Sequence, residues 1–254
     1  YAEMEEKPAR RIKLAPIVSS AKSDMVICKM WDRKCHIAPD LVVVEGPLAG
    51  GHLGFSLDQL SAYGADTADV PATYDRDAYD REVKAVMKVV EEYGDKYGRH
   101  IPVVTAGGIY THEDVMHQLE LGADGVQVAT RFVTTEECDA DIRYKEAYIK
   151  AAKEEIAIVK SPVGMPGRAI LNPFMKRVMD GEKFTPKKCL GCLHKCEPAK
   201  IPYCITERLV AAAKGEVEEA LLFCGEGAYR QQEITTVGDV IQSLMGEEKR
   251  QDER

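Results

Sequence analysis

The best candidate for a catalytic side chain in this sequence is a histidine that directly follows a glycine-rich segment. Residues 45–54 read EGPLAGGHLG, and His52 comes after two consecutive glycines. An imidazole titrates near neutral pH, so it can take or give a proton at a reacting carbon. Ala49, Gly50 and Gly51 present almost no side chain, so a flat ring can lie against them. The alternative is that His52 merely hydrogen-bonds a loop.

Small residues also follow the next two apolar runs. Gly107 and Gly108 come after residues 101–106, and Ala129 and Thr130 come after the run GVQV. Glycine lets a backbone amide approach a phosphate, and a following helix N-terminus adds partial positive charge. Neither segment fits a P-loop or a dinucleotide fingerprint. Together they predict a phosphate site, whereas Gly107 and Gly108 alone are equally typical of a plain turn.

Short β-branched runs, typical of strands, alternate along the chain with segments of helical periodicity. This alternation predicts a parallel sheet, whose strands would position the glycine segments. Thr111, with Asp114 three residues later, is expected to cap one of the helices. Residues 157–180 are expected to be irregular up to a helix from Asn172. The sequence predicts strands at 13–20, 40–46, 101–106 and 125–129, and helices at 22–34, 78–93, 111–122, 141–156, 205–214, 216–223 and 234–246.

Consecutive phosphate-binding loops are typical of the last two strands of a TIM (β/α)8 barrel. The four predicted strands then correspond to the fifth to eighth strands of such an α/β barrel. We therefore expect the first four to be absent from this chain. An unclosed half-barrel exposes strand edges, which favours a homo-oligomer or pairing with a missing N-terminal half.

Four cysteines are clustered within sixteen residues. They form the pattern Cys189-x2-Cys192-x3-Cys196-x7-Cys204. Four thiolates at such spacing suit Zn²⁺ or an iron–sulfur cluster, which would serve as a structural centre or at most as an electron relay. The alternative is four reduced cysteines in a compact cap without metal.

Composition narrows the function classes. The net charge is −8, the hydrophobic fraction is 45%, and no apolar run approaches the length of a membrane span. These values argue against a nucleic-acid or membrane binder. We expect the partner to be a small-molecule substrate. No secretory signal is visible, and the other four cysteines are scattered. We therefore expect a reducing, cytoplasmic compartment.

Three ordered blocks of the sequence resemble a known family. EGPLAGGHLG is similar to the E-G-x-x-A-G-G-H-x-G segment of nitronate monooxygenases, formerly called 2-nitropropane dioxygenases, and of FMN-type enoyl-acyl carrier protein reductases. IPVVTAGGI and LGADGVQVATRF resemble the next two blocks, and the likeness extends from Lys13 to about Lys160. The resemblance implies an FMN-containing TIM barrel, with its C-terminal half at 1–160 and a helical, cysteine-containing extension at 161–254.

The resemblance also assigns roles by position. His52 matches the catalytic histidine, and Gln127 would lie near the ribityl chain. Ala129 stands where the family usually has glycine, and the alanine would tighten the phosphate loop slightly. The flavin would be lined by Ala49, Gly50 and Gly51, and its phosphate would be bound by Gly107, Gly108, Ala129 and Thr130.

Three functions follow from these observations. The first is an FMN-dependent oxidoreductase that oxidises nitronates or nitroalkanes with molecular oxygen, with His52 at the substrate α-carbon. The second is an NAD(P)H-dependent enoyl-acyl carrier protein reductase with the same flavin site. The third is a truncated, non-catalytic half-barrel that needs a partner. Arg168 could offer charge near the site, although an arginine in a Pro/Gly loop is usually solvated.

Overall fold

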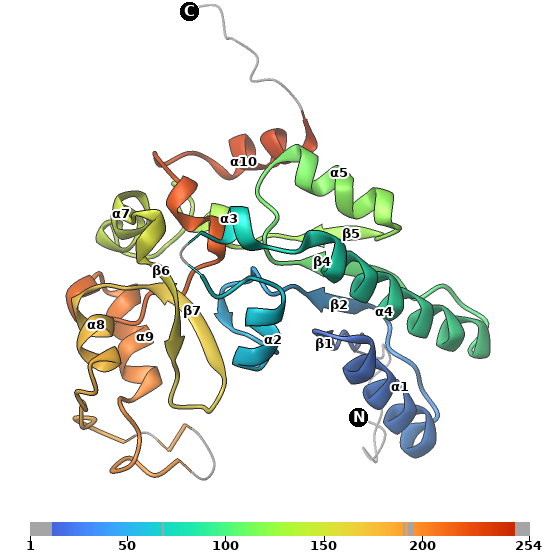
Figure 1. Cartoon of the computed structure of the whole chain (residues 1–254), viewed down its shortest axis with the longest axis horizontal. Coiled ribbons are helices and arrows are strands. Elements are labelled where there is room, and N and C mark those ends of the chain that lie inside the picture. Colours follow the sequence, from blue (N-terminus) through green and yellow to red (C-terminus); the bar gives the residue numbers. More distant parts are fainter. Residues whose placement is uncertain (1–11, 68, 190, 193–195, 247–254) are drawn as a thin grey trace, which may run out of the picture. The chain divides into compact units, whose positions relative to one another are not determined.

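The computed structural model describes residues 12–67, 69–189, 191–192 and 196–246, which form two compact units (Figure 1). The chain passes repeatedly from one unit to the other. The unit that we call the sheet unit comprises residues 1–46, 75–106 and 113–127. The unit that we call the hairpin unit comprises residues 47–74, 107–112 and 128–254.

A four-stranded parallel sheet forms the centre of the sheet unit. Its neighbouring strands are β1 (Ile17–Val18), β2 (Val42–Glu45), β4 (Val103–Ala106) and β5 (Gly125–Gln127). The continuous valines of β2 are buried, as expected for a parallel strand covered by helices. The predicted strands and their parallel pairing are thus confirmed, although β1 is much shorter than the predicted 13–20.

The helices of this unit also match the prediction. They are α1 (Ala21–Cys35), α4 (Arg76–Lys96) and α5 (His112–Leu121). Helix α1 begins at a capping box of Ser20 and Ser23. It packs along α4, which also contacts β2 (Figure 1).

The strand order bears on the fold class. The strands lie side by side in chain order, β1-β2-β4-β5, with no reversal. Right-handed crossovers then place the connecting helices on one face of the sheet. A doubly wound sheet would instead reverse its order at a switch point. The order is that of a barrel wall; closure into a barrel stays a prediction.

The hairpin unit is built on an antiparallel sheet in the order β3-β7-β6. Its strands are β3 (Gly51–His52), β6 (Ile156–Lys160) and β7 (Pro166–Ile170), the last two forming the yellow hairpin of Figure 1. The α-helices around it are α2 (Leu57–Ala62), α3 (Val70–Thr73), α6 (Thr130–Val133), α7 (Ile142–Lys150), α8 (Pro173–Met179), α9 (Ile205–Ala213) and α10 (Val237–Met245). Short 3-10 turns lie at η1 (Lys153–Glu155), η2 (Val217–Glu219) and η3 (Glu226–Arg230). In the described part of the chain, no helix is long and apolar enough to cross a membrane.

Three predictions for this unit were wrong. Residues 157–170 are not irregular, because they form most of the β6–β7 hairpin. The helix expected at 141–156 ends at Lys150, since residues 153–155 form the 3-10 turn η1 and Ile156 begins β6. The helix expected at 216–223 is only the single turn η2, after which Phe223 bridges to Ala169 of β7. Strand β7 also pairs with β3, more than a hundred residues earlier, and such distant partners leave no local signal. The division after residue 160 stays a prediction, although the hairpin runs across it.

A buried carboxyl group on α1 is an unusual feature of the sheet unit. Asp24 is fully buried, and its Oδ1 accepts a hydrogen bond from Cys28 Sγ at 3.6 Å. Its Oδ2 has no partner among the described residues. Burial raises the pKa of Asp24 to about 6, and the hydrogen bond from Cys28 lowers it in part.

This pKa predicts how stability depends on pH. Because the pKa of Asp24 is raised above its ordinary value of 3.8, the stability that its proton provides is complete below that value and is lost as pH rises through about 6. Asp24→Asn should therefore raise the free energy of unfolding at neutral pH by at most about 3 kcal/mol and flatten its decline with pH. Urea titrations across this range measure it, with the exposed Asp95→Asn as control. A destabilised Asp24→Asn protein at neutral pH would contradict the expectation.

Candidate active site

His52 lies in the short strand β3 of the hairpin unit. Its Nε2 is 2.6 Å from Ser161 Oγ, in the turn between β6 and β7. The ring of Phe223 meets the imidazole edge-on, with centroids 4.9 Å apart. Burial lowers the pKa of His52 below its ordinary value of 6.5, so the imidazole is uncharged at neutral pH and able to accept a proton. Sequence reasoning missed Ser161 and Phe223, because both reach His52 only through the sheet of the hairpin unit.

The glycine segments of the hairpin unit lie against one another. Gly107 has φ +88°, and a Cβ there would lie 2.9 Å from both Cβ and N of Ala49. A Cβ on Gly50 would lie 2.3 Å from the carbonyl carbon of Cys224. These glycines are therefore required where backbone passes backbone. Gly51 differs: it has φ +72°, and a Cβ there would meet no atom within 4 Å. The side of the loop at Gly51 is open.

A segment that sequence reasoning missed ties these loops to Thr130. The amide of Gly225 donates to Thr130 Oγ1 at 3.0 Å, and the amide of Glu226 donates to the carbonyl of Leu48 at 3.1 Å. Because Thr130 Oγ1 accepts from Gly225, its own proton is left to donate elsewhere. The only available signal was the CGEG sequence after an apolar run.

The remaining predicted cofactor residues differ in setting. Among the hydrogen bonds of the described residues, none uses the amide N–H of Gly107 or Gly108, and Gly108 is exposed. Ala129 is exposed and directly precedes α6. Gln127 ends β5 in the sheet unit, so its part in the site stays a prediction. The hairpin unit alone therefore brings together His52, Ala49, Gly50, Gly51, Gly107, Gly108 and Thr130.

Arg168 is not the solvated residue that its Pro/Gly surroundings indicated. Its side chain in β7 is 2% exposed, and Nη1 donates to the carbonyls of Pro47 and Ala49 at 2.7 and 2.8 Å. Nη2 donates to the carbonyl of Ala65. Burial lowers the pKa of Arg168 to about 10, so the guanidinium remains charged at neutral pH. The buried guanidinium of Arg168 thus holds the glycine loop in place through its carbonyls, so Arg168 is a positioning residue.

The four predicted metal ligands lie in or beside the segment between α8 and α9. Cys189 and Cys192 are exposed, and Cys196 and Cys204 are partly buried. Within the described residues, no three Cys, His, Asp or Glu side chains are grouped closely enough to hold a metal ion. The metal site thus stays a prediction.

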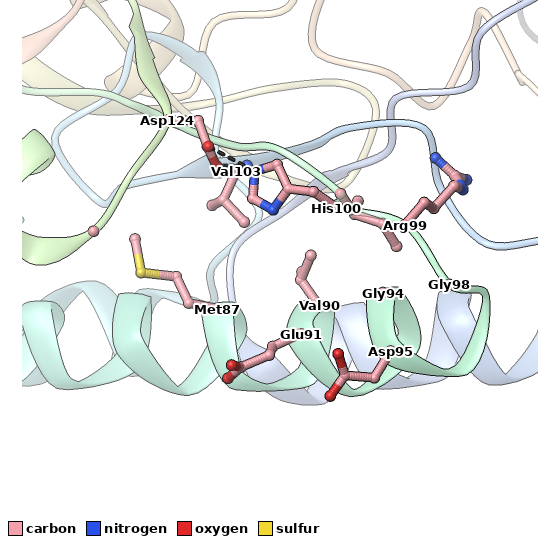
Figure 2. A pocket seen from close by; sticks show the side chains of 12 residues that line it. Met87, Val90, Glu91, Gly94, Asp95, Gly98, Arg99, His100, Val103 and Asp124 are labelled. Atoms are coloured by element: carbon pink, nitrogen blue, oxygen red, sulfur yellow. Dashed lines mark hydrogen bonds and ion pairs between the residues drawn. The ribbon is translucent and has the colours of Figure 1, made fainter.

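A hollow of about 640 Å³ in the sheet unit has a different setting (Figure 2). Met87 and Val90 of α4 form one side, and His100 and Asp124 form another. Asp124 Oδ1 lies 2.7 Å from His100 Nε2, and Figure 2 marks this interaction with a dashed line. His100 and Asp124 precede β4 and β5, whereas parallel sheets bind ligands where strands end. We therefore place the candidate active site at the glycine loops.

Comparison with known proteins identifies the family. The model of the nitronate monooxygenase family matches residues 2–247. The chain belongs to the nitronate monooxygenase family. Two curated relatives carry the name probable nitronate monooxygenase. The one from Staphylococcus saprophyticus is 28% identical over 147 residues, and the one from Staphylococcus aureus strain Newman is 29% identical over 150. Each match covers 58% of this chain and 36% of the relative, so the chain spans about a third of the length of these family members.

Solved structures of similar fold extend the comparison. FabK from Thermotoga maritima aligns with a TM-score of 0.62 at 24% identity, over 92% of this chain and 60% of FabK. A nitroalkane oxidase from Streptomyces ansochromogenes aligns with a TM-score of 0.63 at 20% identity, over 92% of this chain and 57% of the oxidase. At these identities, the likeness shows only that FabK and the nitroalkane oxidase share the fold of this chain.

Removal of the buried guanidinium should release the glycine loop. Arg168→Met leaves the carbonyls of Pro47, Ala49 and Ala65 without their donor, and an unsatisfied buried polar group costs about 1–3 kcal/mol. We expect the free energy of unfolding to fall by about 3–5 kcal/mol in total. Thermal or urea unfolding measures the loss. The exposed Arg76→Met is the control and should change stability by less than about 0.5 kcal/mol. An equally small effect for Arg168→Met would show that the loop does not depend on this side chain.

The pKa of His52 should report its surroundings. NMR titration of the ring should give a value below 6.5, because burial favours the uncharged form. Its contribution to stability is then present above pH 6.5 and is lost as pH falls through the lowered pKa. Phe223→Ala should raise the pKa towards 6.5, whereas Phe184→Ala, which truncates a ring packed on Phe174, should leave it unchanged. A midpoint above 6.5 in the unmodified protein would refute the burial argument.

Proposed function

We propose that this chain carries the flavin site of an FMN-dependent oxidoreductase that oxidises nitronates or nitroalkanes. The observation that carries the proposal is the position of His52. It adjoins the open side of Gly51, in the same unit as the amides of Gly107 and Gly108 and the hydroxyl of Thr130. The names of the curated relatives support the choice of substrate.

The residues present fit FMN. Gly107 and Gly108 offer unused amide donors, and Thr130 offers a hydroxyl proton, which are the groups that a phosphate requires. The open side of Gly51 leaves room for a flat ring, which a Cβ would occupy. When bound, FMN supplies an electron acceptor that molecular oxygen can reoxidise.

His52 provides the proton chemistry. Its uncharged imidazole can accept the α-proton of a nitroalkane or hydrogen-bond the anionic nitronate. The hydrogen bond between Nε2 and Ser161 Oγ fixes the orientation of the ring, and the ring of Phe223 packs against the imidazole. Arg168 keeps the glycine loop in place beneath the site and adds positive charge, which favours anionic ligands.

We further propose that the sheet unit forms four consecutive β/α units of a TIM barrel. The order β1-β2-β4-β5 and the similar solved structures support this. Eight strands close a barrel.

Activity assays distinguish the candidate reactions. Purified protein reconstituted with FMN should consume oxygen when ethylnitronate is added, without NADPH. His52→Ala should reduce kcat/KM by about 10²–10⁴-fold, the usual contribution of a positioned acid or base. His100→Ala, which changes an exposed histidine of the sheet unit, is the control and should leave the rate unchanged.

Two outcomes would contradict the proposal. Rapid reduction of the flavin by NADPH, with consumption of a crotonyl thioester and no nitronate oxidation, would establish an enoyl reductase instead. Failure of the protein to bind FMN, alone or with a complementing N-terminal half, would exclude a flavin site.

A further inference from the structure

Two arginine side chains of the hairpin unit lie against the ring of Tyr110. The guanidinium carbon of Arg131 is 4.9 Å from the centroid of this ring, and that of Arg230 is 4.0 Å from it. The face of an aromatic ring attracts a cation, but two cations beside the same ring also repel each other. The three side chains, which we call the arginine cluster, therefore favour a negative partner.

No described carboxylate forms an ion pair with the arginine cluster. The arginines that form ion pairs in the described part of the chain are Arg76, Arg99, Arg143, Arg177 and Arg208. Arg230 is exposed at the end of η3, so its guanidinium can reach a ligand. The positive charge of the cluster is thus available to an anionic ligand.

Arg131 also has unused donors. Among the hydrogen bonds of the described residues, only its Nη1 donates, to the carbonyl of Tyr110 at 2.9 Å and to Ser243 Oγ of α10 at 3.2 Å. Its Nε is buried without a partner, and a buried donor without an acceptor costs free energy. Nε and Nη2 form an edge of the guanidinium that can donate two parallel hydrogen bonds to one oxyanion. An anion at this edge would satisfy both nitrogens.

The neighbours of the arginine cluster hold it in place. A Cβ on Gly227 would lie 3.1 Å from the Tyr110 ring, so η3 packs directly against this ring. The two hydrogen bonds from Nη1 tie the guanidinium of Arg131 to the backbone at Tyr110 and to α10. Cations that are already positioned bind an anion without the full cost of ordering their side chains.

The arginine cluster adjoins the proposed flavin phosphate site but faces other neighbours. Thr130 and Arg131 are consecutive residues of α6, and consecutive helical side chains point about 100° apart. Thr130 Oγ1 accepts from the amide of Gly225, whereas Arg131 donates to Ser243. The hydroxyl of Thr130 and the arginine cluster therefore present two separate places for an anionic group.

We propose that Arg131 and Arg230 bind a phosphoryl group of a second ligand, beside the flavin phosphate. A phosphomonoester carries about two negative charges at neutral pH, which match the two guanidiniums. A carboxylate carries one charge and would leave one guanidinium without a counter-charge. Nucleotides and phosphopantetheine both contain a phosphomonoester, so either is a source of this group. Only the neighbouring flavin rests on the proposed function; the arginine cluster does not.

Isothermal titration of the FMN-saturated full chain with inorganic phosphate tests the proposal. We expect about one phosphate to bind per chain, with an affinity that falls as salt is added, because the attraction is between charges. Acetate should bind at least about tenfold more weakly than phosphate, because it carries a single charge.

Variants show which side chains bind the phosphate. Arg230→Met should weaken binding at least about tenfold, as expected for loss of a charge-assisted hydrogen bond. Arg230→Lys keeps the charge but loses the planar fork, so its loss should be smaller. Arg143→Met, which changes an exposed arginine paired with Asp141 in the same unit, is the matched control and should leave the affinity unchanged. Arg131→Met should act like Arg230→Met. Because it also loses two internal hydrogen bonds, the exposed Arg230→Met decides the test if Arg131→Met fails to fold.

Paired organic probes identify the source of the phosphate. Adenosine 2′-phosphate is compared with adenosine, and 4′-phosphopantetheine is compared with pantetheine. A gain of at least about tenfold from the phosphate indicates a nucleotide in the first pair and an acyl-carrier group in the second. Either gain should disappear in Arg230→Met. If neither phosphate improves binding, the proposal is overturned.

Two further results would overturn the proposal. Equal phosphate affinity in Arg230→Met and Arg143→Met would show that the arginine cluster is not the site. Loss of the Arg230-dependent phosphate site when FMN binds would show that the arginines bind the flavin phosphate itself. If the chain does not bind FMN, the same comparison of variants in FMN-free protein still tests the cluster. Failure of this proposal is therefore distinct from failure of the proposed oxidoreductase.

Discussion

The buried guanidinium of Arg168 is the interaction on which the candidate active site depends. A charged group is expensive to remove from water unless hydrogen bonds satisfy it. Arg168 meets this requirement with three backbone carbonyls from two loops, and it thereby joins β7 to the glycine segment before His52. The loop has no regular structure between Pro47 and Gly50, so a central cation that binds several of its oxygens determines its path.

Close backbone packing completes this arrangement. Ala49 leaves no room for a side chain at Gly107, and Cys224 leaves none at Gly50. Gly50 and Gly107 therefore lie against neighbouring chain segments, whereas a Cβ on Gly51 would meet no atom within 4 Å. Gly50 and Gly107 are thus needed for close packing of the segments at Ala49, Gly107 and Cys224. The open surface at Gly51 lies beside this packed region.

The antiparallel hairpin links the separate features of this unit. Strand β7 pairs with His52 on one side and with β6 on the other, and the turn between them carries Ser161. Tyr203 binds the end of β6 and stands next to the cysteine-bearing loop. The site histidine and the buried arginine are therefore held by the same antiparallel sheet.

Local sequence patterns were sufficient to predict the parallel sheet, the helices α1, α4 and α5, and the glycine segments that lie beside His52. These features are local: β-branched runs, helical periodicity and glycines each leave a signal within a few residues. The hairpin at 157–170, the burial of Arg168, and the positions of Ser161, Phe223 and Gly225 in the site became evident only from the folded chain. Their partners lie up to about 170 residues away in the sequence, as with Phe223 and His52, and pairings at that distance depend on the whole fold.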